Sequence, residues 1–333
     1  MITDQHGRNV NYMRISITDR CNLRCFYCRP CESFHNIPHQ DLLRYEELLA
    51  LMKMARNLGV EKIRLTGGEP MVRKDFSQFL QRVHQELPQL DLRLTTNATL
   101  LNGQAPLLAQ IGLDKINISL DTLRRGKYEL ITGRDRFVQV RRAIDQCLDH
   151  GIAVKVNVVA LKGVNDEEMP EFMAFARNLP VDLRFIEFMP IGRDSAWAKQ
   201  YFWPAGDILR QARDHADLTP FVPDPETHTH GPAQLYTIQG GLGRLGIISP
   251  LSNHFCGTCN RLRITSHGSL RTCLFSDKEY RFRAMLRHPK LGIRAVERLF
   301  RLAGEAKPVG YVLLKEMARQ RPVCHTAMSA IGG

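Results

Sequence analysis

Residues 12–28 read YMRISITDRCNLRCFYC, a strand-like run that leads directly into three cysteines. Apolar and polar residues alternate densely over 12–17, as in a strand whose sheet is covered on at least one face. Cys21, Cys25 and Cys28, here called the first cysteine set, follow with the spacing C-x3-C-x2-C. This density of cysteines is unusual for small core residues on one helix face. We therefore expect a metal site at the end of the first strand.

The strand pattern recurs along the first part of the chain, with amphipathic stretches between the runs. Strands are expected at 12–17, 62–66, 91–96, 115–120, 153–161 and 182–188. Helices are expected at 41–57, 75–86, 137–150 and 166–178. Alternating strands and helices predict an α/β fold with a parallel sheet, either an open barrel or a doubly wound sheet. In both architectures ligands bind at the carboxyl ends of the strands.

Residues with chemical functions follow several of the expected strands. Gly67, Gly68 and Glu69 come directly after the strand at 62–66, Asn97 follows the strand at 91–96, and Asp121 follows the strand at 115–120. The carboxyl ends of parallel strands meet at one edge of the sheet, so these residues are expected to gather around a binding site.

The composition is that of an ordinary globular protein, with 44% hydrophobic and 24% charged residues in a chain of 333. It excludes disordered, collagen-like and coiled-coil proteins. A net charge of +12 suits phosphates, nucleic acids or anionic membranes as partners, although a soluble surface explains it equally well. The sequence has no apolar run of the ~18 residues that a membrane span needs and no secretory signal at its start. We expect a cytoplasmic protein without a membrane segment.

The length suggests about two domains. The stretch 219–232 contains four prolines, and we expect it to connect two regions, divided as 1–225 and 226–333. His228 and His230 within it are expected to be solvated. The second region carries Cys256, Cys259 and Cys273, here called the second cysteine set.

The second cysteine set is expected to be assembled by a β-hairpin. The flanking runs RLRIT and SLRTCLF predict two strands joined near Ser266, a register that would place Cys259 opposite Cys273. Arg261 and Arg263 share the strand parity of Cys259 and should face the same side. Two interpretations remain open at this point. One is an iron–sulfur cluster with an open iron beside an anion site, and the other is a zinc ribbon whose arginines contact solvent or nucleic acid.

Cys31 leaves the ligand count of the first cysteine set open. A fourth thiolate would allow a closed zinc site or a fully ligated iron–sulfur cluster. Three thiolates would leave one iron with a free position, which is typical of a catalytic metal site.

The two cysteine sets and their surroundings resemble known families. The pattern C-x3-C-x2-C with an aromatic residue before the last cysteine, together with TGGEP at 66–70, resembles the radical S-adenosylmethionine superfamily. The pattern CGTCNRLRIT followed by GSLRTCLF narrows the resemblance to the GTP 3′,8-cyclase family of molybdenum cofactor biosynthesis. Further matches are NYMRISITD, TTNATLL, INISLDTL, ITGRDRF, KVNVV, RFIEFMP and the terminal Gly-Gly.

The resemblance implies a partial (β/α)6 barrel over 1–225, followed by a C-terminal region that carries a second cluster. Each cysteine set would hold one [4Fe-4S] cluster, and S-adenosylmethionine would bind at the first. The residues implied for S-adenosylmethionine are Tyr27, Gly68, Ser119 and Met189. Those implied for GTP are Arg14, Arg64, Thr95, Lys155, Arg184, Arg261 and Arg263. The catalytic residues implied are Arg261, Arg263, Gly332 and Gly333.

The implied reaction begins with reductive cleavage of S-adenosylmethionine to a 5′-deoxyadenosyl radical. This radical removes the 3′-hydrogen of GTP, and C3′ attacks C8 of the same guanine. One electron and one proton then complete 3′,8-cyclo-7,8-dihydro-GTP. The implied partners are GTP, an external flavodoxin-like or ferredoxin-like electron donor, a second copy of the chain, and the next enzyme of the pathway, but neither nucleic acid nor membrane. The alternatives are a peptide-modifying radical enzyme with an auxiliary cluster and a zinc-stabilised nucleic-acid-binding protein.

Overall fold

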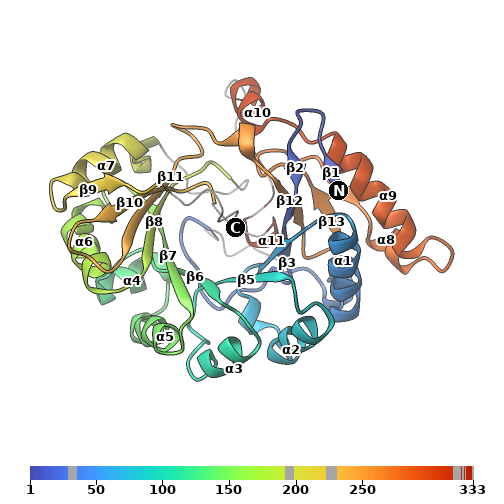
Figure 1. Cartoon of the computed structure of the whole chain (residues 1–333), viewed down its shortest axis with the longest axis horizontal. Coiled ribbons are helices and arrows are strands. Elements are labelled where there is room, and N and C mark those ends of the chain that lie inside the picture. Colours follow the sequence, from blue (N-terminus) through green and yellow to red (C-terminus); the bar gives the residue numbers. More distant parts are fainter. Residues whose placement is uncertain are drawn as a thin grey trace.

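The computed structural model describes residues 1–28, 36–191, 199–222, 231–317, 324, 326 and 328–331. Within these residues one twelve-stranded sheet has the order β14-β13-β12-β3-β4-β5-β6-β7-β8-β11-β10-β9. Neighbouring strands are parallel from β12 through β3 and β8 to β11, and the outermost strands on both sides are antiparallel. Figure 1 shows the sheet curving around a central space, with α1 to α6 on its outer side.

The strands described are β1 Ile2–Thr3, β2 Asn9–Val10, β3 Tyr12–Ser16, β4 Lys62–Thr66, β5 Asp91–Thr96, β6 Lys115–Ser119, β7 Ala153–Ala160, β8 Asp182–Glu187, β9 Leu218–Pro220, β10 Gln234–Ile238, β11 Arg244–Ile248, β12 Arg261–Ile264, β13 Ser269–Arg271 and β14 Tyr280–Arg281. The α-helices described are α1 Tyr45–Asn57, α2 Phe76–Glu86, α3 Ala105–Gln110, α4 Arg125–Thr132, α5 Phe137–Asp149, α6 Met169–Asn178, α7 Ala205–Arg213, α8 Arg283–Arg287, α9 Gly292–Glu305, α10 Gly310–Met317 and α11 Met328–Ile331.

The prediction of a partial barrel is confirmed by the order of the parallel strands. From β3 to β8 the strands lie in the sheet in the order of the chain. A doubly wound sheet would instead reverse its order at a switch point, so that alternative is wrong. Each of these strands begins at the residue expected from the sequence, and each ends within one residue of its expected end.

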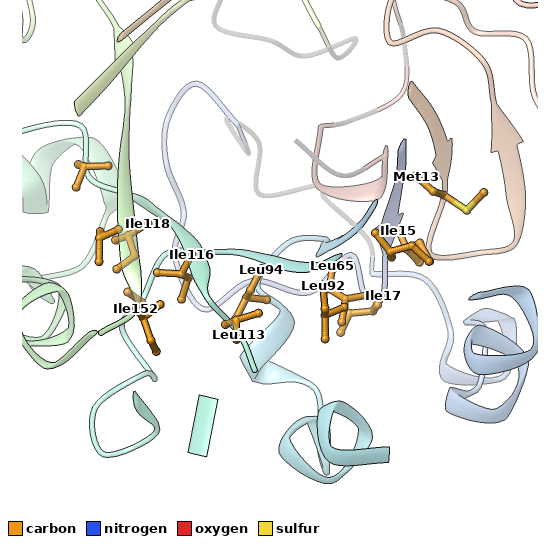
Figure 2. Packing of buried hydrophobic residues seen from close by; sticks show 14 of the residues in the cluster. Met13, Ile15, Ile17, Leu65, Leu92, Leu94, Leu113, Ile116, Ile118 and Ile152 are labelled. Carbon is orange, nitrogen blue, oxygen red and sulfur yellow. The ribbon is translucent and has the colours of Figure 1, made fainter. Parts of the chain in front are cut away.

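The two faces of each strand have different partners. On the outer face, aliphatic side chains such as Ile15, Leu65, Leu94 and Ile116 are fully buried. Figure 2 shows this row of side chains on the side of the sheet that faces the helices. The alternate residues are mainly polar and point into the barrel, because successive side chains of a strand project to opposite faces. The core therefore lies between sheet and helices, and the barrel interior is available for ligands.

The C-terminal region completes the sheet on both sides. Strand β11 pairs in parallel with β8, and β12 pairs in parallel with β3. The strands β9, β10 and β11 were not expected from the sequence, and Thr219 and Pro220 of the expected connecting stretch lie in β9. One sheet thus runs across the expected division at residue 225, and that division stays a prediction.

The expected register of the second-region hairpin is wrong by two residues. Arg263 pairs with Arg271, so the turn is centred on position 267. Extension of this register places Cys273 opposite position 261 and not opposite Cys259. The cause is the turn itself, which Gly268 closes with a φ of +83° and an N–H that donates to a carbonyl three residues earlier.

The helices differ from the expectation mainly at their starts. The first begins at Tyr45 and not at residue 41, because Arg44 stays extended and its N–H donates to the side chain of Glu47. The fourth begins at Met169, after a single 3-10 turn. The helices α3 and α4 were not expected from the sequence; they are only 6 and 8 residues long, which leaves about two turns over which a helical pattern could be recognised. Among the described helices, none has the length and apolar character needed to cross a bilayer.

Candidate active site

One cavity of about 770 Å³ occupies the barrel interior and is lined by every described residue of the predicted sites. These residues are Arg14, Cys21, Cys25, Tyr27, Cys28, Arg64, Gly68, Thr95, Ser119, Lys155, Arg184, Met189, Cys256, Cys259, Arg261, Arg263 and Cys273. The two cysteine sets, 228 or more residues apart in the chain (256 minus 28), therefore share one chamber.

The first cysteine set lies in the loop that follows β3. The Sγ atom of Cys21 accepts a hydrogen bond from the N–H of Leu23 at 3.4 Å, and the side-chain amide of Asn97 donates to it at 3.7 Å. Donors directed at sulfur are typical of the surroundings of a metal-bound thiolate. Burial raises the pKa of the Cys25 thiol well above its usual value, so the thiolate is disfavoured until a metal binds it. This sulfur environment fits an iron–sulfur cluster.

The glycine segment after β4 lies flat against the backbone that leads into Cys21. The N–H of Gly68 donates to the carbonyl of Thr18 at 2.8 Å. A Cβ on Gly68 would lie 2.2 Å from the carbonyl oxygen of Arg20, and one on Gly67 would lie 2.3 Å from that of Thr18. Only glycine allows this approach, so both glycines are required to shape the loop that leads into Cys21.

Glu69 ties this segment to the end of β5. Its fully buried carboxylate accepts hydrogen bonds from the hydroxyl of Thr96 at 2.7 Å and from the N–H groups of Asn97 at 2.6 Å and Met71 at 3.0 Å. Burial raises the pKa of Glu69 to about 7, although these donors oppose the shift. Since Asn97 also donates to Cys21, the glutamate fixes the surroundings of the first cysteine set.

Tyr27 is held by a carboxylate on the cavity wall. Its hydroxyl donates to Asp121 at 2.5 Å, and the other oxygen of Asp121 accepts the N–H of Val159 at 2.8 Å. Burial raises the pKa of Asp121 to about 6. Tyr27, directly before the last cysteine of the first set, is thus anchored to the ends of β6 and β7.

A row of arginines crosses the barrel wall at one level. Arg263 pairs in register with Arg14, Arg14 with Arg64, and Arg64 with Arg93, and all four line the cavity. Like charges at directly opposite positions of neighbouring strands destabilise a sheet. Burial and the neighbouring cations lower the pKa of Arg14 to about 10 and that of Arg263 well below its usual value. This arrangement is suited to a bound polyanion, which would relieve the repulsion.

Two further groups near this row titrate near neutrality. Burial and the charge of Arg184 lower the pKa of Lys155 to about 7. Burial favours the neutral form of Tyr12, but the charges of Arg64 and Arg14 outweigh it and lower its pKa to about 7. Arg64 donates to the hydroxyl of Tyr12 at 2.7 Å. The positive charge of the cavity therefore depends on pH.

The second cysteine set lies around the start of β12, the neighbour of β3 in the sheet. The first set follows the end of β3, so the two sets lie toward opposite ends of these parallel strands. Burial would raise the pKa of Cys259, but the cations Arg261 and Lys307 lower it to about 7. A Cβ on Gly310 would lie 2.9 Å from Sγ of Cys273 and 3.3 Å from Sγ of Cys256. Glycine there leaves room around the sulfurs, which fits a bulky inorganic group bound to this set.

Some predicted residues lie outside the described residues: Cys31, His228, His230, Gly332 and Gly333. Helix α11, directly before the terminal glycines, contacts β3, and its Met328 lines the cavity. Among the described residues, no three His, Cys, Asp or Glu side chains converge closely enough to hold a single metal ion.

The sequence interpretation missed several residues of this site. Arg93 follows the same strand parity as Thr95, and that periodicity could have identified it. Asp121 was noted only for its position after a strand. Lys307, on the cavity wall beside the second cysteine set, has no signal in the sequence, because only the fold brings it there.

Models of two known protein families match the two halves of the chain. The model of the radical SAM superfamily matches residues 15–176, and that of Molybdenum Cofactor Synthesis C matches residues 181–313. A protein of Syntrophomonas wolfei named GTP 3′,8-cyclase is 44% identical over 307 residues, which are 92% of this chain and 93% of the relative. A protein of the same name from Alkaliphilus oremlandii is 40% identical over 99% of both chains.

Solved structures support the fold. The crystal structure of Streptococcus suis SuiB bound to S-adenosylmethionine superposes with a TM-score of 0.61 at 17% identity, covering 97% of this chain and 77% of that chain. A second crystal structure of Streptococcus suis SuiB superposes with a TM-score of 0.62, covering 98% of this chain and 78% of that chain. At this identity the likeness concerns the fold alone.

Proposed function

Because this chain belongs to the GTP 3′,8-cyclase family, we propose that it converts GTP into 3′,8-cyclo-7,8-dihydro-GTP in molybdenum cofactor biosynthesis. Membership of the radical SAM superfamily supports S-adenosylmethionine and an iron–sulfur cluster as its cofactors. The finer assignment, with two [4Fe-4S] clusters and the residues that hold each ligand, is part of this proposal. The zinc-stabilised nucleic-acid-binding protein is set aside, since full-length relatives are cyclases.

The observation that carries the proposal is the arginine row between the two cysteine sets. Arg263, Arg14, Arg64 and Arg93 concentrate positive charge at one level of a chamber that both sets line. A triphosphate carries the opposite charge and offers oxygens that guanidinium groups bind in pairs. The chamber thus suits a molecule with a polyanionic end and a planar base.

The first cysteine set is proposed to hold a [4Fe-4S] cluster together with Tyr27, Gly68, Ser119 and Met189 as the S-adenosylmethionine site. When bound, these cofactors supply the radical that removes the 3′-hydrogen of GTP. The chain's own contribution is to fix the cysteine loop through Glu69 and to shield the site.

The remaining residues are proposed to position GTP. Arg14, Arg64, Thr95, Lys155 and Arg184 would bind the triphosphate and ribose. Arg261 and Arg263 would hold the nucleotide beside the second cluster, on Cys256, Cys259 and Cys273. Anchoring both ends of the nucleotide restricts its rotation, so that C3′ stays near the abstracting carbon and C8 stays near C3′.

The terminal Gly332 and Gly333 are proposed to enter the chamber behind α11, whose Met328 already lines it. An external flavodoxin-like or ferredoxin-like protein is proposed as electron donor, with a homodimer as the working form. The product would pass to the next enzyme of the pathway.

The test uses protein reconstituted with iron and sulfide under anaerobic conditions. We expect about eight irons per chain for two clusters. With reductant, S-adenosylmethionine and GTP, the products are 5′-deoxyadenosine and cyclised nucleotide in equal amounts. Deuterium placed at C3′ of GTP should appear in 5′-deoxyadenosine. Deoxyadenosine formation that is independent of GTP, without any cyclised nucleotide, would refute the proposed activity.

Arg64→Met tests the triphosphate site. Loss of a charged hydrogen bond of about 1.5–3 kcal/mol should weaken GTP binding by about 10- to 150-fold. Arg125→Met is the matched control, because that side chain is 65% exposed on α4 and pairs only with Asp135 among the described carboxylates. Equal GTP affinities of the two variants would contradict the assignment.

A further inference from the structure

Lys307 is a buried cation beside the second cysteine set. Lys307 is only 1% exposed to solvent. The ammonium donates to the carbonyl of Thr272 at 2.8 Å and to Sγ of Cys259 at 3.6 Å. Within the described part of the chain, no carboxylate lies at ion-pair distance from it. A buried charge needs a counter-charge, and sulfur at position 259 is the group here that can become negative.

The segment 307–311 surrounds the sulfurs of the second cysteine set. Lys307 donates to Cys259, and a Cβ on Gly310 would lie 2.9 Å from Sγ of Cys273 and 3.3 Å from Sγ of Cys256. Each sulfur is thus approached by this one segment. The position of the ammonium is part of that arrangement.

A buried arginine, Arg8, fixes the segment 307–311 relative to the cysteine loop. Arg8 donates to the carbonyls of Cys256 at 2.7 Å, of Lys307 at 3.0 Å and of Pro308 at 3.0 Å. Arg8 is itself buried and paired with Asp4 at 2.6 Å. The backbone of Lys307 therefore cannot move away from the cysteines without breaking several buried hydrogen bonds.

We propose that Lys307 is a positioning residue that stabilises the reduced form of the second cluster through its hydrogen bond and charge on the sulfur of Cys259. This inference rests on the proposed function, since it requires that the second cysteine set holds a cluster. Reduction adds one negative charge to a cluster, and a nearby fixed cation favours that form. Hydrogen bonds to the cluster sulfurs raise the reduction potential in the same way.

The direction of the change in reduction potential follows from the charge of Lys307. Removal of the ammonium shifts the equilibrium toward the oxidised cluster, so the potential becomes more negative. We expect a change of about tenfold in the reduction equilibrium, which corresponds to about 59 mV for a one-electron couple. A residue that only fills space would change iron content or stability without this shift.

The experiment uses the full-length chain in which Cys21, Cys25 and Cys28 are replaced by Ser, so that any cluster signal comes from the second set. Lys307→Met removes the charge at similar length, and Lys307→Arg keeps it. Iron content and the midpoint potential, followed by electron paramagnetic resonance during anaerobic titration, are measured for each. The holoenzyme with both clusters serves as the reference for the spectrum.

The proposal is supported if Lys307→Met has a lower midpoint potential at full iron content and the midpoint potential of Lys307→Arg stays close to that of the parent chain. Loss of iron in Lys307→Met alone would contradict the proposal, because it would show that the charge is needed for the cluster to bind and not for its reduced form. Equal potentials in all three proteins, or loss of iron in both variants, would overturn the role of the charge. If the parent chain with Lys307 intact binds no iron, the proposed second cluster itself fails, and this is seen before any variant is compared.

Discussion

GTP binding should weaken as pH rises above about 7, because Lys155 loses its charge there. Lys155 lies half-buried on β7, in register with Asn117 on one side and Asp182 on the other. Burial and the charge of Arg184 lower its pKa to about 7. Close to neutral pH, the empty protein is therefore divided between charged and neutral lysine.

The sign of the effect follows from linkage between protonation and binding. A bound triphosphate favours the ammonium and raises the pKa of Lys155 above its value in the free protein. The contribution of this charge to binding is fully present below about pH 7 and is lost as pH rises toward the pKa of the complex. One linked proton changes the dissociation constant by up to about tenfold per pH unit, or about 1.4 kcal/mol.

Ionisation of Tyr12 should also weaken GTP binding as pH rises. Its pKa of about 7 means that it gains negative charge over the same range, next to Arg64. Lys155→Arg keeps a positive charge at all these pH values, so it should reduce the slope without abolishing it. Tyr12→Phe should remove a separate part of the slope.

The assay is equilibrium dialysis of GTP with reconstituted protein from about pH 7 to about pH 8.5, above the last phosphate ionisation near pH 6. The wild-type chain should lose affinity with rising pH, and Lys155→Arg should lose it more slowly. The reasoning is refuted if both proteins show the same slope, or if the wild type binds GTP more tightly at higher pH.

Three further substitutions test the glycine contacts and the core. Gly67→Ala places a methyl group 2.3 Å from the carbonyl oxygen of Thr18, and we expect loss of iron from the first cysteine set in iron analysis and a lower melting temperature. Gly310→Ala places a methyl group 2.9 Å from Sγ of Cys273, and iron analysis should show a fall from about eight to about four irons per chain. Phe172→Ala opens the packing between α6 and β8, and denaturant unfolding should show a loss of about 3–5 kcal/mol because the side chain is fully buried.

Matched controls separate these effects from a general effect of substitution. Gly206→Ala lies in α7 with open space around the added methyl, so iron content and stability should be retained. Val138→Ala, on an exposed face of α5, should cost much less stability than Phe172→Ala. Full iron content in Gly67→Ala or Gly310→Ala, or a loss below about 1 kcal/mol in Phe172→Ala, would contradict the packing described.

The barrel strands could be predicted because each is a short buried run bounded by turn residues. Strands β4 and β5 each begin one residue before their first aliphatic residue, and this pattern is local. Strand β10 could not be predicted in this way. Its residues are mostly exposed or half-buried, with only Ile238 buried, so it lacks the alternation that identifies a strand. The strand conformation of β10 is stabilised by its antiparallel pairing with β11, which the local sequence pattern does not show.

The candidate site was predictable where spacing carries the chemistry. Both cysteine sets and the segment Gly67-Gly68-Glu69 are local motifs, and the structure places the cysteines, Gly67 and Gly68 on one cavity, with Glu69 buried behind them. The hairpin register was not predictable from strand lengths, because the turn at Gly268 decides which residues face each other. The position of Lys307 depends on contacts with segments far away in the chain, and that of Arg93 in the arginine row depends on the register of β5 against β4.

The sequence by itself determined the repeating strand and helix units, the two cysteine sets and the family to which they belong. These features depend on residue types at short spacing, and no long-range contact is needed to recognise them. Only the tertiary structure decided that Arg263, from the C-terminal region, lies in register beside Arg14 and so joins a row of cations inside the barrel. The parallel pairing of β12 with β3 joins segments nearly 250 residues apart (261 minus 12 is 249), and sheet closure, not local propensity, fixes that pairing.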